Sequence, residues 1–160
     1  MPTDKNLIGA AGEHLVLSRL LEKGILASQA PRGTRKADIL VNPLDGGLPI
    51  LIQVKSTVET GIRLKWHMKE KHEGIVEKDL FYCFVALNKE NSSIYVIPAK
   101  QVSKVISSAY QAWLRKPGAK GQAHNESEMR WIATNYPFTV PGVQDGWMDV
   151  YLENWEQLSS

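Results

Sequence analysis

A short stretch of the sequence combines residue types that can support hydrolytic chemistry. Asp38 is followed by Gln53, Val54 and Lys55, the last three within the apolar run LIQVKS. A carboxylate, an amide oxygen and an amine together can hold a hard cation and orient a water molecule. Side chains alternate between the faces of a strand, so Gln53 and Lys55 point the same way and their apolar neighbours point into the opposite layer. This polar pair indicates a face that opens on a cleft; the alternative is an edge strand in contact with water.

The elements that position these residues follow from the flanking sequence. Segments 37–42 (ADILVN) and 49–57 (PILIQVKST) have strand composition, and the turn residues NPLDGG lie between them. A connection this short lets the two strands pair antiparallel. That pairing would bring the carboxylate of Asp38 towards the amide and the amine on the second strand.

Periodicity predicts the other regular elements. Apolar residues recur at helical spacing over 5–23, with Asp4 as a candidate N-cap and Gly24 as a stop, and again over 99–113. Three further strands are expected, at 25–30, 80–87 and 93–98. The order helix, three strands, two more strands and a helix predicts an α/β fold with a mixed β-sheet flanked by helices.

Two segments give no clear periodicity, and a third is plainly a loop. Residues 61–78 are charged and fit either a helix or an ordered loop, whereas 116–127 is the most loop-like segment. Residues 129–160 hold three of the five tryptophans. We expect this Trp-rich segment to pack on the core or on a partner subunit, as part of a single domain that spans 1–160.

Composition excludes several classes of protein. Cys83 is the single cysteine, so an internal disulfide and a cysteine-based zinc site are excluded, and its apolar surroundings indicate a buried, inert thiol. No P-loop, dinucleotide fingerprint, G-x-S-x-G elbow or H-E-x-x-H motif is present. The sequence has no leader-like or membrane-length apolar run, so we expect a soluble, intracellular (cytoplasmic) protein without a membrane partner.

The arrangement around Asp38 resembles a known nuclease superfamily. The sequence has G-E-H-L-V on the first predicted helix, then A-D-I-L-V and L-I-Q-V-K-S on two consecutive strands. This series, within residues 8–57, resembles the PD-(D/E)XK superfamily, which includes archaeal Holliday-junction resolvases, Mrr-like and other restriction endonucleases, and some homing endonucleases. The resemblance implies a restriction-endonuclease-like core and a metal-dependent endodeoxyribonuclease.

The resemblance also implies a role for each site residue. Glu13 would be the helical carboxylate, Asp38 the central metal ligand, Gln53 the residue at the second acidic position and Lys55 the lysine. The metal would be Mg²⁺ or Mn²⁺, with the backbone carbonyl of Val54 as a further ligand. Lys55 would orient or help deprotonate the attacking water, or stabilise the phosphate.

Gln53 departs from the family pattern, in which this position is Glu or Asp. An amide oxygen can coordinate a cation but brings no negative charge, which also suits a catalytically silent DNA-binding module of the same fold. Glu59, farther along the same predicted strand face, is a candidate substitute carboxylate. A structural or protein-interaction subunit that uses the Trp-rich segment is a third possibility.

The distribution of charge suits the DNA partner that the resemblance implies. Residues 32–71 carry eight Lys and Arg against four Asp and Glu. Within this range the loop that precedes Asp38 suits contacts with backbone phosphates, although a solvated loop is the alternative. The resemblance further implies a homo-oligomer, a dimer or higher, because one active site cuts one strand. Ser56 and Thr57, which follow Lys55, could either donate to phosphate or simply end the strand. The predicted DNA-binding residues are Arg32, Arg35, Lys36, Ser56 and Thr57.

Overall fold

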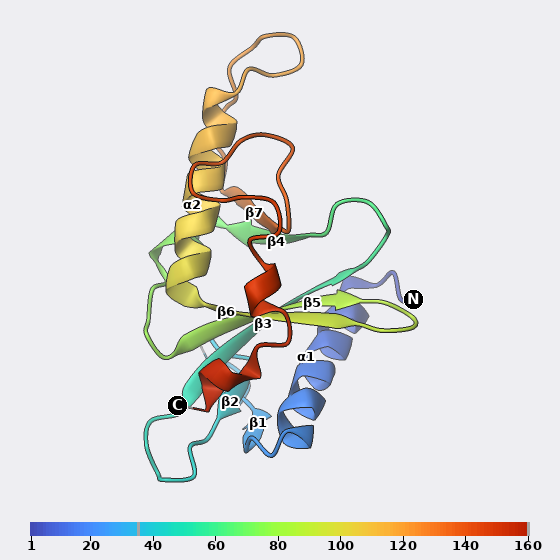
Figure 1. Cartoon of the computed structure of the whole chain (residues 1–160), viewed down its shortest axis with the longest axis vertical. Helices are drawn as coiled ribbons and strands as arrows, with labels where there is room; N and C mark the ends of the chain where they lie inside the picture. The colour runs from blue at the N-terminus through green and yellow to red at the C-terminus, as the bar shows by residue number, and fades with distance from the viewer. Residues whose placement is uncertain (35, 160) are drawn as a thin grey trace.

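The computed structural model describes residues 1–34 and 36–159. The chain forms two long helices, two β-sheets and three short 3-10 turns in this part (Figure 1). The helices and turns are α1 (Lys5–Glu22), α2 (Ala99–Arg115), η1 (Glu70–Gly74), η2 (Asp149–Tyr151) and η3 (Trp155–Leu158). The strands are β1 (Ala27–Gln29), β2 (Ile39–Val41), β3 (Ile50–Val58), β4 (Lys65–Lys69), β5 (Leu80–Leu87), β6 (Ser93–Pro98) and β7 (Met129–Ala133).

The main sheet has five strands in the order β1-β2-β3-β5-β6. Strands β1, β2 and β3 form the predicted antiparallel meander, β3 pairs with β5 in parallel, and β5 pairs with β6 antiparallel. The predicted fold class, an α/β fold with a mixed sheet flanked by helices, is therefore confirmed. Strands β4 and β7 pair antiparallel in a separate two-stranded sheet.

Helix α1 begins and ends where the sequence predicts. The carboxylate of Asp4 accepts hydrogen bonds from the backbone N–H groups of Asn6 and Leu7, and Gly24 follows the helix at a φ of 74°. Gly12 faces β3 so closely that a Cβ at this position would lie 1.8 Å from Ser56 Oγ. The absence of a side chain at Gly12 thus lets α1 pack directly on the strand that carries the candidate site residues.

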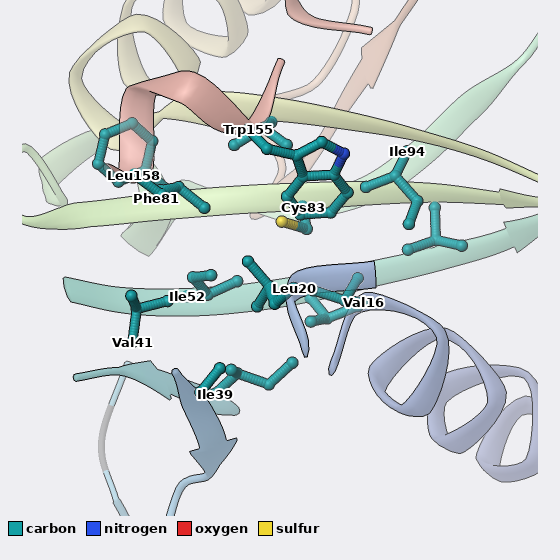
Figure 2. Close-up of a cluster of buried hydrophobic side chains, with 14 of the residues drawn as sticks. Val16, Leu20, Ile39, Val41, Ile52, Phe81, Cys83, Ile94, Trp155 and Leu158 are labelled. Carbon is teal, nitrogen blue, oxygen red and sulfur yellow. The ribbon is translucent and has the colours of Figure 1, made fainter. Parts of the chain in front are cut away.

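One face of the main sheet packs against α1 and the end of the chain. Val16 and Leu20 of α1 meet apolar residues of β2, β3 and β5, and Trp155 and Leu158 close this core from the other end of the chain (Figure 2). Cys83 lies inside this cluster and is fully buried, and burial raises the pKa of its thiol. The inert, buried thiol expected from the sequence is confirmed.

The opposite face of the sheet packs against α2 and the β4–β7 sheet. Tyr82 and Phe84 of β5 lie in a second core with apolar residues of α2, β4 and β7. All eight residues of β5 are buried, as expected for a strand covered on both faces. Trp66 of β4 is 2% exposed, and its indole N–H donates to the carbonyl of Val85 at 2.9 Å.

For residues 61–78 the sequence left a helix and an ordered loop open, and neither alternative included the strand that the structure has in this segment. Residues 65–69 form β4, with alternating exposed and buried side chains, and η1 follows. The sequence KWHMK has the period-2 alternation of a half-buried strand, but its charges conceal it. The pairing partner, β7, lies far along the chain and could not be identified from local pattern.

No helix in the described ranges is long and apolar enough to cross a membrane. The number of domains that the full protein contains stays a prediction.

Candidate active site

Asp38 occupies the position where β2 meets β3. Its backbone N–H donates to the carbonyl of Ile52, the register partner of Ile39, at 2.8 Å. Its carboxylate Oδ2 accepts a hydrogen bond from the backbone N–H of Val54 at 2.7 Å. The side chain is half-buried and held on the middle of β3, as the predicted hairpin requires.

The backbone of Val54 faces the same edge of β3 as the carboxylate. The N–H and C=O groups of one residue in an extended strand point to the same side, and those of the next residue point to the other. The N–H of Val54 points to Asp38, so its carbonyl points to that side too. The predicted backbone ligand and the central carboxylate therefore lie on one edge.

Gln53 and Lys55 point away from α1, as alternation predicts. Ile52 and Val54 belong to the core on the α1 side, whereas Gln53 lies opposite Tyr82 of β5 on the other face. Gln53 Oε1 is buried and accepts no hydrogen bond from any residue in the described ranges. A buried amide oxygen without a donor is available to a cation or a water molecule, because it would otherwise lose its hydration without compensation.

Lys55 is half-buried next to Asp38. Burial is the largest influence on the pKa of Lys55 and lowers it, and the positive charges of Lys71 and Lys69 lower it further. The negative charge of Asp38 acts in the opposite direction. This lysine is consequently a better proton acceptor than an exposed one, which suits a role beside an attacking water.

Glu13 lies on α1 close enough to Asp38 for the two carboxylates to repel each other. Burial raises the pKa of Glu13 most, the negative charge of Asp38 raises it further, and His14 opposes both. A carboxylate whose pKa is raised by a neighbouring negative charge, as that of Glu13 is, lies where a cation would be favourable. The predicted helical carboxylate and the predicted central ligand are thus electrostatic neighbours.

The predicted donor set has the oxygen chemistry of a site for a hard divalent cation. It comprises the carboxylates of Glu13 and Asp38, the amide oxygen of Gln53 and the backbone carbonyl of Val54. Gln53 lies on the face of β3 that points away from α1, the helix that carries Glu13. Oxygen ligands of this kind suit Mg²⁺, which keeps several waters and needs few protein ligands. Within residues 1–34 and 36–159, no three His, Cys, Asp or Glu side chains gather closely enough to hold a metal, so the amide and carbonyl oxygens are essential to the set.

The basic loop before Asp38 is exposed. Arg32 faces solvent, Lys36 has a φ of 70° and forms an ion pair with Glu77, and both residues remain accessible. Arg35, the third predicted phosphate contact, lies outside the described residues. The side chain of Lys36 would therefore have to break its ion pair with Glu77 before it could contact a DNA phosphate.

Ser56 and Thr57 lie on opposite faces of β3. The hydroxyl of Ser56 is buried against Gly12, on the α1 side of the sheet, so the prediction that it contacts phosphate is corrected. Thr57 shares the face of Lys55 and lines an open groove. Glu59, the candidate substitute carboxylate, is exposed at the end of β3 and accepts from the side-chain amide of Asn88 at 3.0 Å.

Two features of the site were not predicted from the sequence. A groove of about 270 Å³ begins at Lys55 and runs between the end of β3, the loop 59–64 and β4, where it is lined by Arg63, Lys65 and His67. Beside it, His72 is buried and its Nδ1 accepts from the backbone N–H of Lys69 at 2.8 Å. Two sequence signals pointed to the groove wall: the alternation of KWHMK and its basic residues interleaved with an aromatic side chain, a pattern that suits an element facing DNA.

Comparison with known proteins supports the fold. No protein-family model matches the chain, and no curated protein matches it in sequence. Among solved structures it is similar to a bacterial homing endonuclease, I-Ssp6803I, with a TM-score of 0.52 and 18% sequence identity. The match covers 96% of this chain and 89% of the homing endonuclease chain. The chain therefore has the fold of a nuclease.

Proposed function

We propose that the chain is a metal-dependent endodeoxyribonuclease of the PD-(D/E)XK type that hydrolyses DNA phosphodiester bonds. The observation that carries this proposal is the position of Asp38: its carboxylate is bound to the backbone of β3 between Gln53, whose amide oxygen has no donor among the described residues, and Lys55. The similarity in fold to a homing endonuclease supports the proposal independently of these contacts.

Each residue has a role in this proposal. Asp38, Glu13, Gln53 Oε1 and the carbonyl of Val54 would hold Mg²⁺ or Mn²⁺. A bound divalent ion supplies an acidified water and positive charge for the scissile phosphate. Lys55, with its lowered pKa, accepts a hydrogen bond or a proton from the attacking water and then stabilises negative charge on the phosphate.

The proposal includes a homo-oligomer, because each active site hydrolyses one strand and cleavage of a duplex needs two. Sedimentation velocity in the presence and absence of DNA tests this part. A monomer under both conditions, in a protein that still makes double-strand breaks, would remove the oligomer from the proposal.

The direct test is cleavage of supercoiled plasmid with Mg²⁺ or Mn²⁺. Asp38→Ala and Lys55→Ala should each lower cleavage by at least about a thousandfold, because the first removes a metal ligand and the second the group that positions water or phosphate. Lys100→Ala, at an exposed position on α2, is the matched control and should cut like the wild type. Cleavage that is unchanged in both site variants would place the chemistry elsewhere.

A catalytically silent DNA-binding module is the second candidate, favoured by the amide at Gln53. Gln53→Glu adds a negative charge beside Asp38, so Mn²⁺ affinity measured by calorimetry should increase, by about tenfold. An active wild type that keeps cutting, with a shifted metal optimum in Gln53→Glu, supports the nuclease. An inert wild type that gains cleavage on this substitution supports the silent module, and absence of metal binding by both proteins rejects the metal site.

A further inference from the structure

The β4–β7 sheet is a two-stranded antiparallel ribbon with two chemically different faces. Its register pairs Trp66 with Ile132 and His67 with Trp131. Trp66 and Ile132 are buried in the core beneath α2, so the ribbon is fixed on the molecule by one face. In Figure 1 the ribbon lies beside α2, away from α1.

The other face of the ribbon is basic and accessible along β4, whereas on β7 the ring of Trp131 packs against Tyr136 and Phe138. Lys65, His67 and Lys69 alternate with the buried residues of β4 and are all exposed. On β7 the ring of Trp131 lies on this face, and Lys65 Nζ sits 5.2 Å from its centroid. These four residues are hereafter the outer face. Glu70, the residue directly after β4, is exposed and places one negative charge at the end of this basic row.

The outer face continues into the candidate active site. Lys65 and His67 belong both to the ribbon and to the wall of the groove, and Lys55 lies at the other end of that groove. Arg63 adds a further cation between them. A polyanion bound along the ribbon would therefore lead directly to the proposed site of hydrolysis.

The geometry points to double-stranded DNA as the partner: we infer that the β4–β7 ribbon enters the major groove and contacts it with the outer face. This inference rests on the proposed function for the identity of DNA as the ligand. The major groove of B-DNA, about 12 Å wide, admits a two-stranded β-ribbon, whereas the minor groove is about half as wide. A strand rises about 3.4 Å per residue, so the row from Lys65 to Lys69 spans about four base steps. Lys65 and Lys69 reach phosphates at the groove wall, and His67 faces the base edges.

The test measures binding in EDTA, where no cleavage can occur. A fluorescent duplex of mixed sequence is titrated with wild type, with Lys65→Ala/Lys69→Ala and with Lys100→Ala/Lys104→Ala, which removes two exposed lysines from α2. The ribbon variant should lose at least about tenfold in affinity, and the slope of log affinity against log salt should become shallower by about 2. The α2 variant should behave like the wild type, and melting curves check that both remain folded.

A second arm tests which groove is used. The same duplex with glucosylated 5-hydroxymethylcytosine in place of cytosine has a blocked major groove, and the wild type should bind it at least about tenfold more weakly. His67→Ala should reduce affinity for the unmodified duplex and leave the weak binding of the blocked duplex unchanged.

The outcomes separate this inference from the proposed function. Equal binding by the ribbon variant and the wild type, equal binding of the blocked and unmodified duplexes, or an effect confined to single-stranded DNA overturns the inference while plasmid cleavage still supports the nuclease. Duplex binding through the ribbon without cleavage under any metal supports the inference and rejects the nuclease. A wild type that binds no duplex overturns the inference, and a wild type that neither binds nor cuts any duplex overturns both.

Discussion

In the proposed active site, Lys55 would serve the chemistry at a cost to stability. Its charged group is half-buried, and burial together with Lys69 and Lys71 disfavours the charged form, with Asp38 as the compensating anion. A lysine placed for stability alone would reach solvent with its ammonium group. A substitution of Lys55 can therefore distinguish an effect on cleavage from an effect on the stability of the fold.

Lys55→Met should abolish cleavage and leave the fold as stable as the wild type or more stable, by about 1 kcal/mol. Methionine keeps most of the side-chain volume but needs no solvation of a charge. Plasmid cleavage and urea denaturation of the same preparation provide the two measurements. Lys100→Met is the matched control, and a marked decrease in the urea midpoint of Lys55→Met alone would show that Lys55 stabilises the fold.

At the scale of elements, the packing of α1 on β3 brings Glu13 to Asp38. Gly12, next to Glu13, is the point of closest approach, because a Cβ there would lie 1.8 Å from Ser56 Oγ and 2.9 Å from Ser56 Cβ. The contact between helix and strand thus depends on the smallest possible residue. Any side chain at position 12 must push the two elements apart.

Gly12→Ala should lower the free energy of unfolding by about 1 to 3 kcal/mol through this overlap. Ser56→Gly removes the atoms it meets, so the double variant should regain most of the loss. Gly9→Ala is the control on the same helix, since a Cβ there meets nothing within 4 Å and should stabilise the helix by up to about 1 kcal/mol. Urea denaturation measures the free energy of unfolding of each variant. If the changes caused by the Gly12 and Ser56 substitutions simply add in the double variant, the contact is refuted.

The turn that follows β4 depends on a neutral histidine. His72 accepts a hydrogen bond from the backbone N–H of Lys69 through Nδ1, while Lys55, Lys71 and Lys69 surround it with positive charge. Burial, followed by these charges, lowers the pKa of His72 from 6.5 to about 4. The end of the ribbon is consequently held by a group that resists protonation.

Acid should weaken the fold through His72. As pH decreases from 6.5 to about 4, the unfolded chain binds a proton at His72 that the folded chain does not, so stability falls over this range and His72 adds no further change below it. The loss should be at most about 3 kcal/mol. Urea denaturation as a function of pH measures it. His72→Gln, which keeps an acceptor for Lys69, should show a shallower dependence; the same slope in both proteins would assign the effect to other groups.

At the scale of the whole molecule, positive charge is distributed around the candidate active site. The exposed Arg32 and Lys36 lie in the loop before Asp38, and Arg63, Lys65 and Lys69 lie along the groove and the ribbon. Phosphate contacts position DNA without reading its sequence. We expect the loop and the ribbon to contribute to affinity in this general way.

Replacement of Arg32, Arg35 and Lys36 together by Ala should weaken binding of all duplex sequences about equally and make the salt dependence shallower by up to about 3 in slope. The control replaces three exposed lysines elsewhere, Lys5, Lys23 and Lys89, and should change both quantities much less. Fluorescence anisotropy at several salt concentrations provides the measurement. A triple variant with unchanged affinity and slope would remove the loop from the DNA interface.

The sequence by itself determined the local framework of this protein. The helix α1, the β2–β3 hairpin, β5 and α2 were all predictable, because caps, short turns and hydrophobic periodicity act over a few residues. The pairing of Asp38 with β3 followed from the same rules, since a short connection leaves few possible registers. Local rules alone therefore suffice to bring Asp38 and Lys55, two residues of the candidate site, to neighbouring strands.

Only the tertiary structure decided which distant segments meet. The pairing of β4 with β7, the burial of Ser56 against Gly12 and the ion pair of Lys36 with Glu77 join parts of the chain that carry no shared local signal. Such contacts depend on closing long loops and on burying complementary surfaces, so they are settled by the packing of the whole chain. The basic groove exists for the same reason, because its two walls come from β3 and from a strand that is stable only when paired with β7.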